Sequence, residues 1–214
     1  MEETIKAIKR RFRLRMNGPV AASMREKGMN YRVNFGLNYP QIKEIAAGLQ
    51  PDRALAGRLW EEDVRESKIL STLIYPPGEM SRSEADKWVK EIPYPEIADY
   101  AVMNLFVRLS FAPELMMESV RSGNPLVRYT GFMLASRLFS RGLALPPEWR
   151  DTWLDAACES CCNGPAFVGV AAMNGLERLV QADRTVVTAL KNSLRWKDCE
   201  TIRNFLDRSE ETVG

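Results

Sequence analysis

The sequence predicts an all-α fold, a HEAT-like helical-repeat solenoid (an α-α superhelix) with a concave groove, in which residues 1–214 form a single domain. Apolar residues recur at helical spacing, beginning with the stripe of Ile5, Ile8, Phe12 and Met16. No segment shows the alternation of a half-buried strand between hairpin turns. Proline or glycine stands in most of the short connections, which is typical of adjacent antiparallel helices.

The helices can be placed in order from their periodicity and from the residues that interrupt it. Asn17-Gly18-Pro19 ends the first helix, and Pro76-Pro77-Gly78 ends a helix later in the chain. Ser81 and Glu84 have the spacing of a capping box, and residues 28–37 are predicted to form a loop. The expected helices cover about 2–15, a second ending near 27, 39–48, 51–60, 63–74, 81–92, 96–110, 113–121, 125–141, 147–162, 165–181, 183–194 and 198–208.

A weak internal repeat indicates that these helices stack in pairs. Helix starts of similar character recur at spacings of 33, 30, 41 and 34 residues, which are irregular HEAT-type periods. Each pair exposes an apolar face that only the next pair can bury. Arg65 and Arg203, near two of these starts, are interpreted as structural contacts between repeats. The recurring positions are Val64, Ile97, Val127, Val168 and Ile202.

The composition excludes several classes of site. The chain has no histidine, so a Ser-His-Asp triad, a Cys-His pair and a histidine metal cluster are ruled out. Cys158, Cys161 and Cys162 share one helix face, and we interpret them as buried thiols in a helix interface rather than as metal ligands. No apolar run reaches membrane-spanning length and the first residues do not resemble a signal peptide, so a cytoplasmic protein without cofactor or metal is expected.

The net charge is only +2, so binding to nucleic acid would require positive charge gathered on one face. Lys6, Lys9, Arg10 and Arg13 form one ridge of the first expected helix, and no Asp or Glu occurs between residues 4 and 25. The ridge is interpreted either as a strip that contacts phosphates or as a solvated helix face. The five tryptophans are expected to pack between helices in at least four cases.

The stretch from Trp88 to Asp99, WVKEIPYPEIAD, resembles the motif W-x-x-x-I-x-N-W-D-x-V-D of the AlkD-like DNA alkylation repair family. Trp88, Ile92 and Asp99 match without a gap. Further segments resemble other family motifs in the same order, and together they cover most of residues 30–140. These segments are Phe35–Ile42, Ala54–Trp60, Arg65–Leu70 and Leu126–Thr130.

The resemblance implies a monomeric protein that holds duplex DNA in a basic concave groove. Active members of this family hydrolyse the N-glycosidic bond of N3- or N7-alkylated purines without a cofactor. The resemblance assigns Asp99 to stabilising the sugar cation and Arg128 to holding a backbone phosphate. On this hypothesis Tyr94, Trp88 and Tyr129 form the rim of the pocket, as an aromatic set of this chain's own. A carboxylate suits this reaction because an alkylated base already carries positive charge and leaves without a strong acid.

The sequence departs from the family pattern at positions that carry the chemistry. Pro95 stands where the family has tryptophan, Tyr94 replaces an asparagine, and Tyr129 replaces the second arginine of an Arg-Arg pair. Around Phe167 there is no tryptophan where a late groove aromatic is expected. Three functions therefore stay open: an alkylpurine glycosylase, a catalytically silent member that binds DNA or RNA structures, and a HEAT-type scaffold for proteins.

Two residues also have structural interpretations at this stage. Asp99 could be an acidic residue favoured near a helix N-terminus by the helix dipole. Arg128 could serve as a structural repeat arginine.

Overall fold

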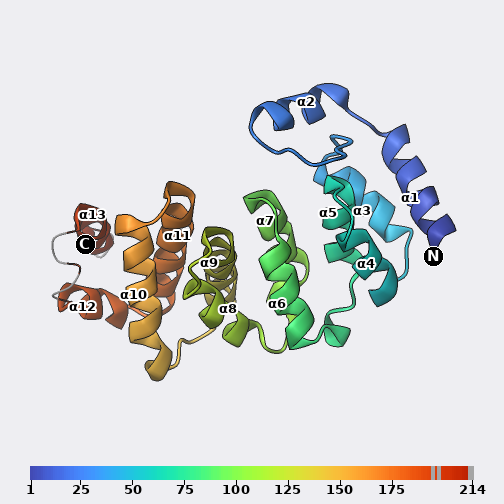
Figure 1. Ribbon diagram of the computed structural model, residues 1–214. Helices are drawn as coiled ribbons and strands as arrows, with labels where there is room; N and C mark the ends of the chain where they lie inside the picture. Colours follow the sequence, from blue (N-terminus) through green and yellow to red (C-terminus); the bar gives the residue numbers. More distant parts are fainter. Residues whose placement is uncertain (194–195, 197–198, 212–214) are drawn as a thin grey trace. The chain divides into compact units, whose positions relative to one another are not determined.

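The structure is a computed structural model that describes residues 1–193, 196 and 199–211, and its described residues are mostly helical (Figure 1). Within these ranges the β pairing is confined to an isolated parallel bridge between Val33 and Val64. The elements are α1 (Glu2–Leu14), α2 (Gly18–Glu26), α3 (Tyr39–Ala47), α4 (Arg53–Trp60), α5 (Arg65–Ile74), η1 (Pro77–Glu79), α6 (Arg82–Glu91), α7 (Pro95–Asn104), η2 (Phe106–Arg108), α8 (Ala112–Val120), α9 (Pro125–Ser140), α10 (Pro147–Asn163), α11 (Ala166–Ala182), α12 (Thr185–Lys191) and α13 (Glu200–Glu211).

The expected helices are all present, and two are clearly shorter than expected. The helix expected over 183–194 is α12, which covers only Thr185–Lys191. The helix expected over 96–110 ends at Asn104, and a 3-10 turn follows after Leu105. The Asn104 side chain accepts a hydrogen bond from Tyr39 Oη at 2.6 Å and donates one to Thr72 Oγ1 at 2.9 Å. These bonds tie the end of α7 to distant segments. The ends expected at residues 194 and 198 lie outside the described residues.

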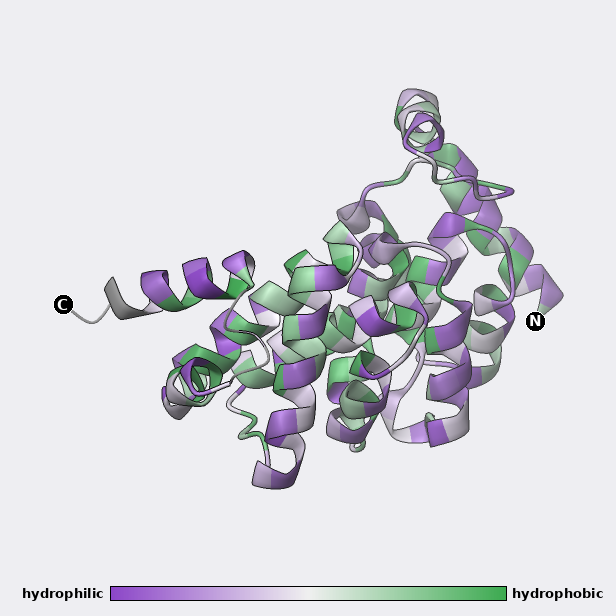
Figure 2. Cartoon of the chain, turned by 60° about the vertical axis from the view of Figure 1, so that its left-hand side comes forward, coloured by the Kyte–Doolittle hydropathy of each residue, from purple (hydrophilic) through white to green (hydrophobic). Residues whose placement is uncertain are grey.

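The chain divides into two compact units, which are described separately. Unit 1 contains residues 1–84 and 104–110, and unit 2 contains residues 85–103 and 111–214. In unit 1, α3 and α4 pack against α5. In unit 2, α8 packs against α9, and both α9 and α10 pack against α11. Figure 2 shows the green, hydrophobic and purple, hydrophilic residues separated onto different sides of many helices.

A buried ion pair at the start of α5 organises the loop before α3. Arg65 and Glu66 are buried, and Arg65 Nη1 lies 3.0 Å from Glu66 Oε1. The Glu66 carboxylate also accepts hydrogen bonds from the backbone N–H groups of Phe35 at 3.1 Å and Leu37 at 3.2 Å. Arg65 Nη1 donates to the Leu37 carbonyl at 2.8 Å. Arg65 is thus a structural arginine, as its position at a repeat start predicts.

The packing of α9 against α8 in unit 2 depends on a glycine. A Cβ atom at Gly131 of α9 would lie 2.6 Å from the Val120 backbone nitrogen at the end of α8. This distance is too short for any larger residue, so Gly131 permits the two backbones to approach. Trp153 fills the neighbouring core and meets Phe132 and Phe139 edge-on, with ring centroids 5.9 and 5.1 Å away.

Four of the five tryptophans, all but the half-buried Trp149, are buried. This confirms that packing accounts for at least four of them. Arg203 is exposed on α13, whose buried residues include Ile202 and Phe205. The structural role of Arg203 stays a prediction; its side chain is exposed and lines a hollow with Trp196 and Leu206.

The cysteines differ in part from the sequence-based interpretation. Cys158 is a buried thiol, as expected. Cys162 forms a disulfide with Cys199 across a separation of 37 residues, so its interpretation as a free thiol is wrong. Cys161 donates through Sγ to the Gly169 carbonyl at 3.6 Å, and burial raises the pKa of its thiol to about 12. A thiol that stays protonated near neutral pH is a poor nucleophile.

Candidate functional site

The carboxylate that the sequence singles out lies on α7 in unit 2. Pro95 occupies the first turn of α7, where a missing N–H costs nothing. Asp99 is the fifth residue and is half-buried beside the apolar face that contains Ala98 and Val102. The first turn has its own acid, Glu96. Because the dipole effect falls off within the first turn, it accounts for Glu96 better than for Asp99.

Tyr129 of α9 holds this carboxylate. The Tyr129 hydroxyl donates a hydrogen bond of 2.8 Å to Asp99 Oδ1. Burial raises the pKa of Asp99, while the Tyr129 hydrogen bond and the positive charge of Arg137 lower it and Glu96 raises it. Burial and the neighbouring Asp99 charge also raise the pKa of Tyr129, so the phenol stays protonated. In this pair the neutral Tyr129 hydroxyl binds one oxygen of the Asp99 carboxylate.

An exposed aromatic ring extends this site onto α11. The Phe167 ring lies 5.6 Å from that of Tyr129 between centroids, at a tilt of 47°. Phe167 is 38% exposed, and Val170 on the same helix is 62% exposed. Sequence reasoning sought a tryptophan near here and passed over Phe167. A search for any aromatic residue at that position would have found it.

Arg128, the neighbour of Tyr129, is partly committed to structure. Its Nε donates a 2.9 Å hydrogen bond to the carbonyl of Ser122, in the turn before α9. This bond fixes the guanidinium beside the start of the helix. No other partner of Arg128 occurs among the described residues. Its terminal N–H groups can therefore face an anion, which fits the role that the resemblance assigns.

The two remaining residues predicted at the pocket rim differ in accessibility. Tyr94 is half-buried immediately before α7, and its carbonyl accepts from the Ile97 N–H at 3.0 Å. Trp88 is only 4% exposed and belongs to the buried face of α6. The prediction that Trp88 forms part of the rim is wrong, because its apolar ring is used in the core of unit 2.

The basic ridge of α1 divides into paired and unpaired cations. Lys6 bonds to Glu3 at 2.9 Å, and Lys9 lies 2.5 Å from Glu62. Arg10 and Arg13 are exposed, and neither has an ionic or hydrogen-bond partner within the described part of the chain. Arg10 and Arg13 are therefore the ridge residues best placed to bind an external anion.

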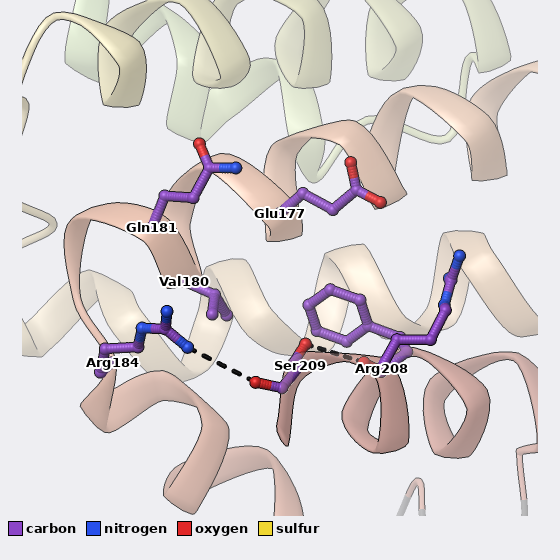
Figure 3. Close-up of a pocket in the computed structure, with 7 residues that line it drawn as sticks. Glu177, Val180, Gln181, Arg184, Arg208 and Ser209 are labelled. Atoms are coloured by element: carbon purple, nitrogen blue, oxygen red, sulfur yellow. Dashed lines mark hydrogen bonds between the residues drawn. The ribbon is translucent and has the colours of Figure 1, made fainter. Parts of the chain in front are cut away.

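A hollow between α11 and α13 is separate from this site (Figure 3). Arg184 lines it and donates to the Ser209 carbonyl in the last turn of α13 at 3.4 Å. This contact satisfies a free carbonyl at a helix C-terminus. Glu177 and Arg208 line the same hollow and give it charges of both signs. The hollow therefore offers no single charge that would select a ligand.

No group of three or more potential metal-binding side chains occurs in the described residues. None of the described helices is both long and apolar enough to span a bilayer.

Over residues 8–187 the sequence matches the family described as "DNA alkylation repair enzyme". The fold is similar to a solved structure described as "A new family of proteins related to the HEAT-like repeat DNA glycosylases with affinity for branched DNA structures". The TM-score is 0.73 at 17% sequence identity, covering 87% of this chain and 81% of that chain. This similarity confirms the all-α, HEAT-like fold. No curated protein matches the sequence.

Proposed function

This chain belongs to the DNA alkylation repair enzyme family, and on that basis we propose that it binds DNA and excises N3- or N7-alkylated purines with Asp99 as the catalytic carboxylate. The observation that carries the proposal is the setting of Asp99. Its carboxylate is half-buried and oriented by Tyr129, whose ring lies 5.6 Å from the exposed ring of Phe167. A partly buried acid whose pKa is shifted by its surroundings is a candidate for a functional site.

The reaction needs little from the protein besides negative charge and a place for water. The C1′–N bond breaks, and its electron pair moves to the alkylated base and neutralises the positive charge there. The ionised Asp99 carboxylate stabilises the cation that develops at C1′. Water then adds to C1′ and gives up a proton, which Asp99 can accept before releasing it to solvent. This use of one carboxylate parallels that in glycoside hydrolysis.

Tyr129 takes part by keeping Asp99 in place. The resemblance puts an arginine at this position, whereas Tyr129 supplies a neutral donor 2.8 Å from Oδ1. A neutral hydrogen bond favours the ionised form without the full charge of an ion pair. Asp99 therefore keeps more of its negative charge available for the sugar cation.

The DNA would be held by contacts of two kinds. In unit 2 the free N–H groups of Arg128 would pair with a backbone phosphate, and Phe167 with Val170 would contact the sugar or a base. In unit 1, Arg10 and Arg13 would bind further phosphates. A monomeric, cytoplasmic protein that acts on duplex DNA without a cofactor is part of the same proposal.

A second function, binding of DNA structures without chemistry, is favoured by one specific observation. The Tyr129 hydroxyl occupies one oxygen of the Asp99 carboxylate, and Pro95 replaces the motif tryptophan. The related solved structure belongs to proteins described as having affinity for branched DNA. On this alternative, DNA binding would not depend on Asp99 and no base would be released.

A base-release assay separates the two functions. We expect the purified protein to release N3-methyladenine or N7-methylguanine from methylated duplex DNA faster than spontaneous depurination. Fluorescence polarisation with the same duplex would measure binding in parallel. DNA binding without base release, at every salt concentration tested, would contradict the enzymatic function and leave the second one.

Tyr129→Phe tests the relation between the hydroxyl and Asp99. Burial raises the pKa of Asp99 and the Tyr129 hydrogen bond lowers it, so removing the hydroxyl is expected to raise that pKa further. Activity requires the carboxylate, so the acidic limb of the pH–rate profile should move to higher pH. A carbon NMR titration of the Asp99 carboxyl measures the same shift without relying on activity.

Tyr39→Phe is a matched control, because it removes a tyrosine hydroxyl bonded to Asn104 in unit 1. It should leave the titration of Asp99 unchanged. An acidic limb and an Asp99 titration that Tyr129→Phe does not move would show that the hydroxyl has no influence on the carboxylate.

A further inference from the structure

The turn between α1 and α2 in unit 1 carries a cluster of exposed apolar side chains. Leu14 is 78% exposed, Met16 is 61% exposed and Val20 is also exposed. The prediction that Met16 continues the apolar stripe of the first helix is wrong, because α1 ends at Leu14. Single exposed apolar residues are normal on protein surfaces. Three within seven residues, on a turn that also carries basic side chains, indicate a contact surface.

The backbone of this turn is held firmly, so the exposure is not caused by a frayed helix end. The Asn17 N–H donates to the Phe35 carbonyl at 2.8 Å, and Asn17 Oδ1 accepts from the Val20 N–H at 3.2 Å. Gly36 has a φ of +72°, and a Cβ there would lie 2.2 Å from the Asn17 carbonyl oxygen. The ring of Phe12 packs against Phe35 with centroids 5.6 Å apart.

The charge carried by this stretch of the chain is of one sign, although Arg15 in the turn pairs with Glu44 at 3.7 Å. Residues 4–25 contain seven Lys and Arg residues and no Asp or Glu. Arg10, one helical turn before Leu14, and Arg13, directly before it, are exposed and have no side-chain partner in the described part of the chain. Arginine binds phosphate through a planar fork of N–H groups and also stacks on flat rings. The complementary ligand is therefore a polyanion that offers apolar surface.

Other occupants fit this surface less well. A helix that lies in a membrane interface needs its whole apolar face free, whereas Ile5, Ile8 and Phe12 of α1 are buried in unit 1. The exposed apolar area is also limited to a few side chains, too small for a stable interface between proteins. Nucleic acid fits, because apolar side chains can wedge between unstacked bases while arginines bind the flanking phosphates.

We propose that this turn is a branch-reading contact, in which Leu14 and Met16 pack against unstacked bases at a DNA junction while Arg10 and Arg13 bind the adjoining phosphates. The inference rests on the proposed DNA binding but not on base release. A branch point offers bases that are already partly unstacked, so the energy needed to expose them is lower than in a continuous duplex.

The test compares a labelled three-way junction with a linear duplex of the same total length, using fluorescence polarisation and the full-length protein. Leu14→Ser combined with Met16→Ser is expected to weaken junction binding by about tenfold, the scale of losing base contacts of this kind. Linear duplex binding should stay within about twofold, because no phosphate contact is removed. These side chains are exposed, so the fold should tolerate the changes.

Arg10→Gln combined with Arg13→Gln should weaken binding to both DNAs. The slope of log K against log salt should become shallower by about 2, since each phosphate contact contributes about 0.9. Arg53→Gln combined with Arg58→Gln makes the same change in net charge at exposed cations of unit 1 that already pair with Glu84 and Glu61. This control should leave both affinities within about twofold.

The outcomes separate this inference from the proposed function. If the wild-type protein binds neither DNA, DNA binding itself fails and the branch contact fails with it. If the wild-type protein binds DNA and the Leu14/Met16 double variant binds the junction as well as the wild type does, only the branch contact is wrong. An equal loss on both DNAs would also contradict it, as would binding to anionic vesicles that depends on these two residues.

Discussion

Asp99→Asn is expected to slow the release of alkylated purines by about 10²–10³-fold, the usual cost of removing one electrostatic stabiliser from a transition state. The amide matches the carboxylate in shape, and its oxygen can still accept the Tyr129 hydrogen bond. The loss should therefore appear in the rate of single-turnover excision. DNA affinity should be unchanged or slightly higher, because one negative charge near the phosphates is removed.

Asp99→Asn is also expected to change the stability of the folded protein, and the sign of the change follows from the pKa of Asp99. Burial raises the pKa of Asp99 in the folded protein, so the folded state holds more protons than the unfolded state between the two pKa values. Stability then falls as pH rises through that window. Asp99→Asn removes this cost, so its melting temperature near neutral pH should equal or exceed that of the wild type. Enzymes commonly lose some stability by keeping a charged group in the active site.

Glu96→Gln is the matched control, because it changes a second acid on α7 that lies in the first turn. It should leave excision within about threefold, since Glu96 acts on Asp99 through its charge, which raises the pKa of that carboxyl less than burial does. Excision that survives Asp99→Asn, or that Glu96→Gln lowers as much as Asp99→Asn does, would remove Asp99 from the catalytic role. Wild-type activity must be measured first, because Asp99→Asn is informative on catalysis only if the enzyme is active.

The sequence predicted the helices well because their boundaries are encoded locally. Asn17 caps α2, and Ser81 and Glu84 exchange the two hydrogen bonds of a capping box, 3.2 Å and 3.3 Å long. Asn124 caps α9 just before Pro125. Each of these signals lies within four residues of the boundary that it sets, so periodicity and capping chemistry suffice.

Features that depend on distant contacts could not be predicted in this way. Asn104 ends α7 through bonds to Tyr39 and Thr72, which are 65 and 32 residues away. The disulfide joins residues 37 positions apart. The burial of Trp88 depends on packing that no local pattern specifies.

The sequence predicted the carboxylate of the candidate site but not the residues that surround it. The family motif located Asp99, and Tyr129 was noticed only as a departure from that motif. Their hydrogen bond depends on how α7 and α9 lie side by side in unit 2. Phe167 lies on a third helix and reaches the site through Tyr129. A pattern along the chain cannot specify a constellation drawn from three helices.

Glu66→Gln is expected to lower the free energy of unfolding by about 3–5 kcal/mol, the cost of leaving one member of a buried ion pair alone. Glu66 is fully buried, and its two oxygens accept from Arg65 and from the backbone N–H groups of Phe35 and Leu37. A glutamine side chain has one acceptor oxygen and would turn N–H groups toward some of these donors. The Arg65 guanidinium would stay buried without its counter-charge.

Urea unfolding followed by circular dichroism measures this loss, and Glu61→Gln provides the comparison. Glu61 is exposed and pairs with Arg58 three residues away, so that change should cost less than about 1 kcal/mol. A loss below about 1 kcal/mol for Glu66→Gln would mean that water or another donor replaces the carboxylate. Because Phe35 also holds Asn17, the damage should spread to the α1–α2 turn and weaken junction binding, while the Asp99–Tyr129 pair in unit 2 stays intact.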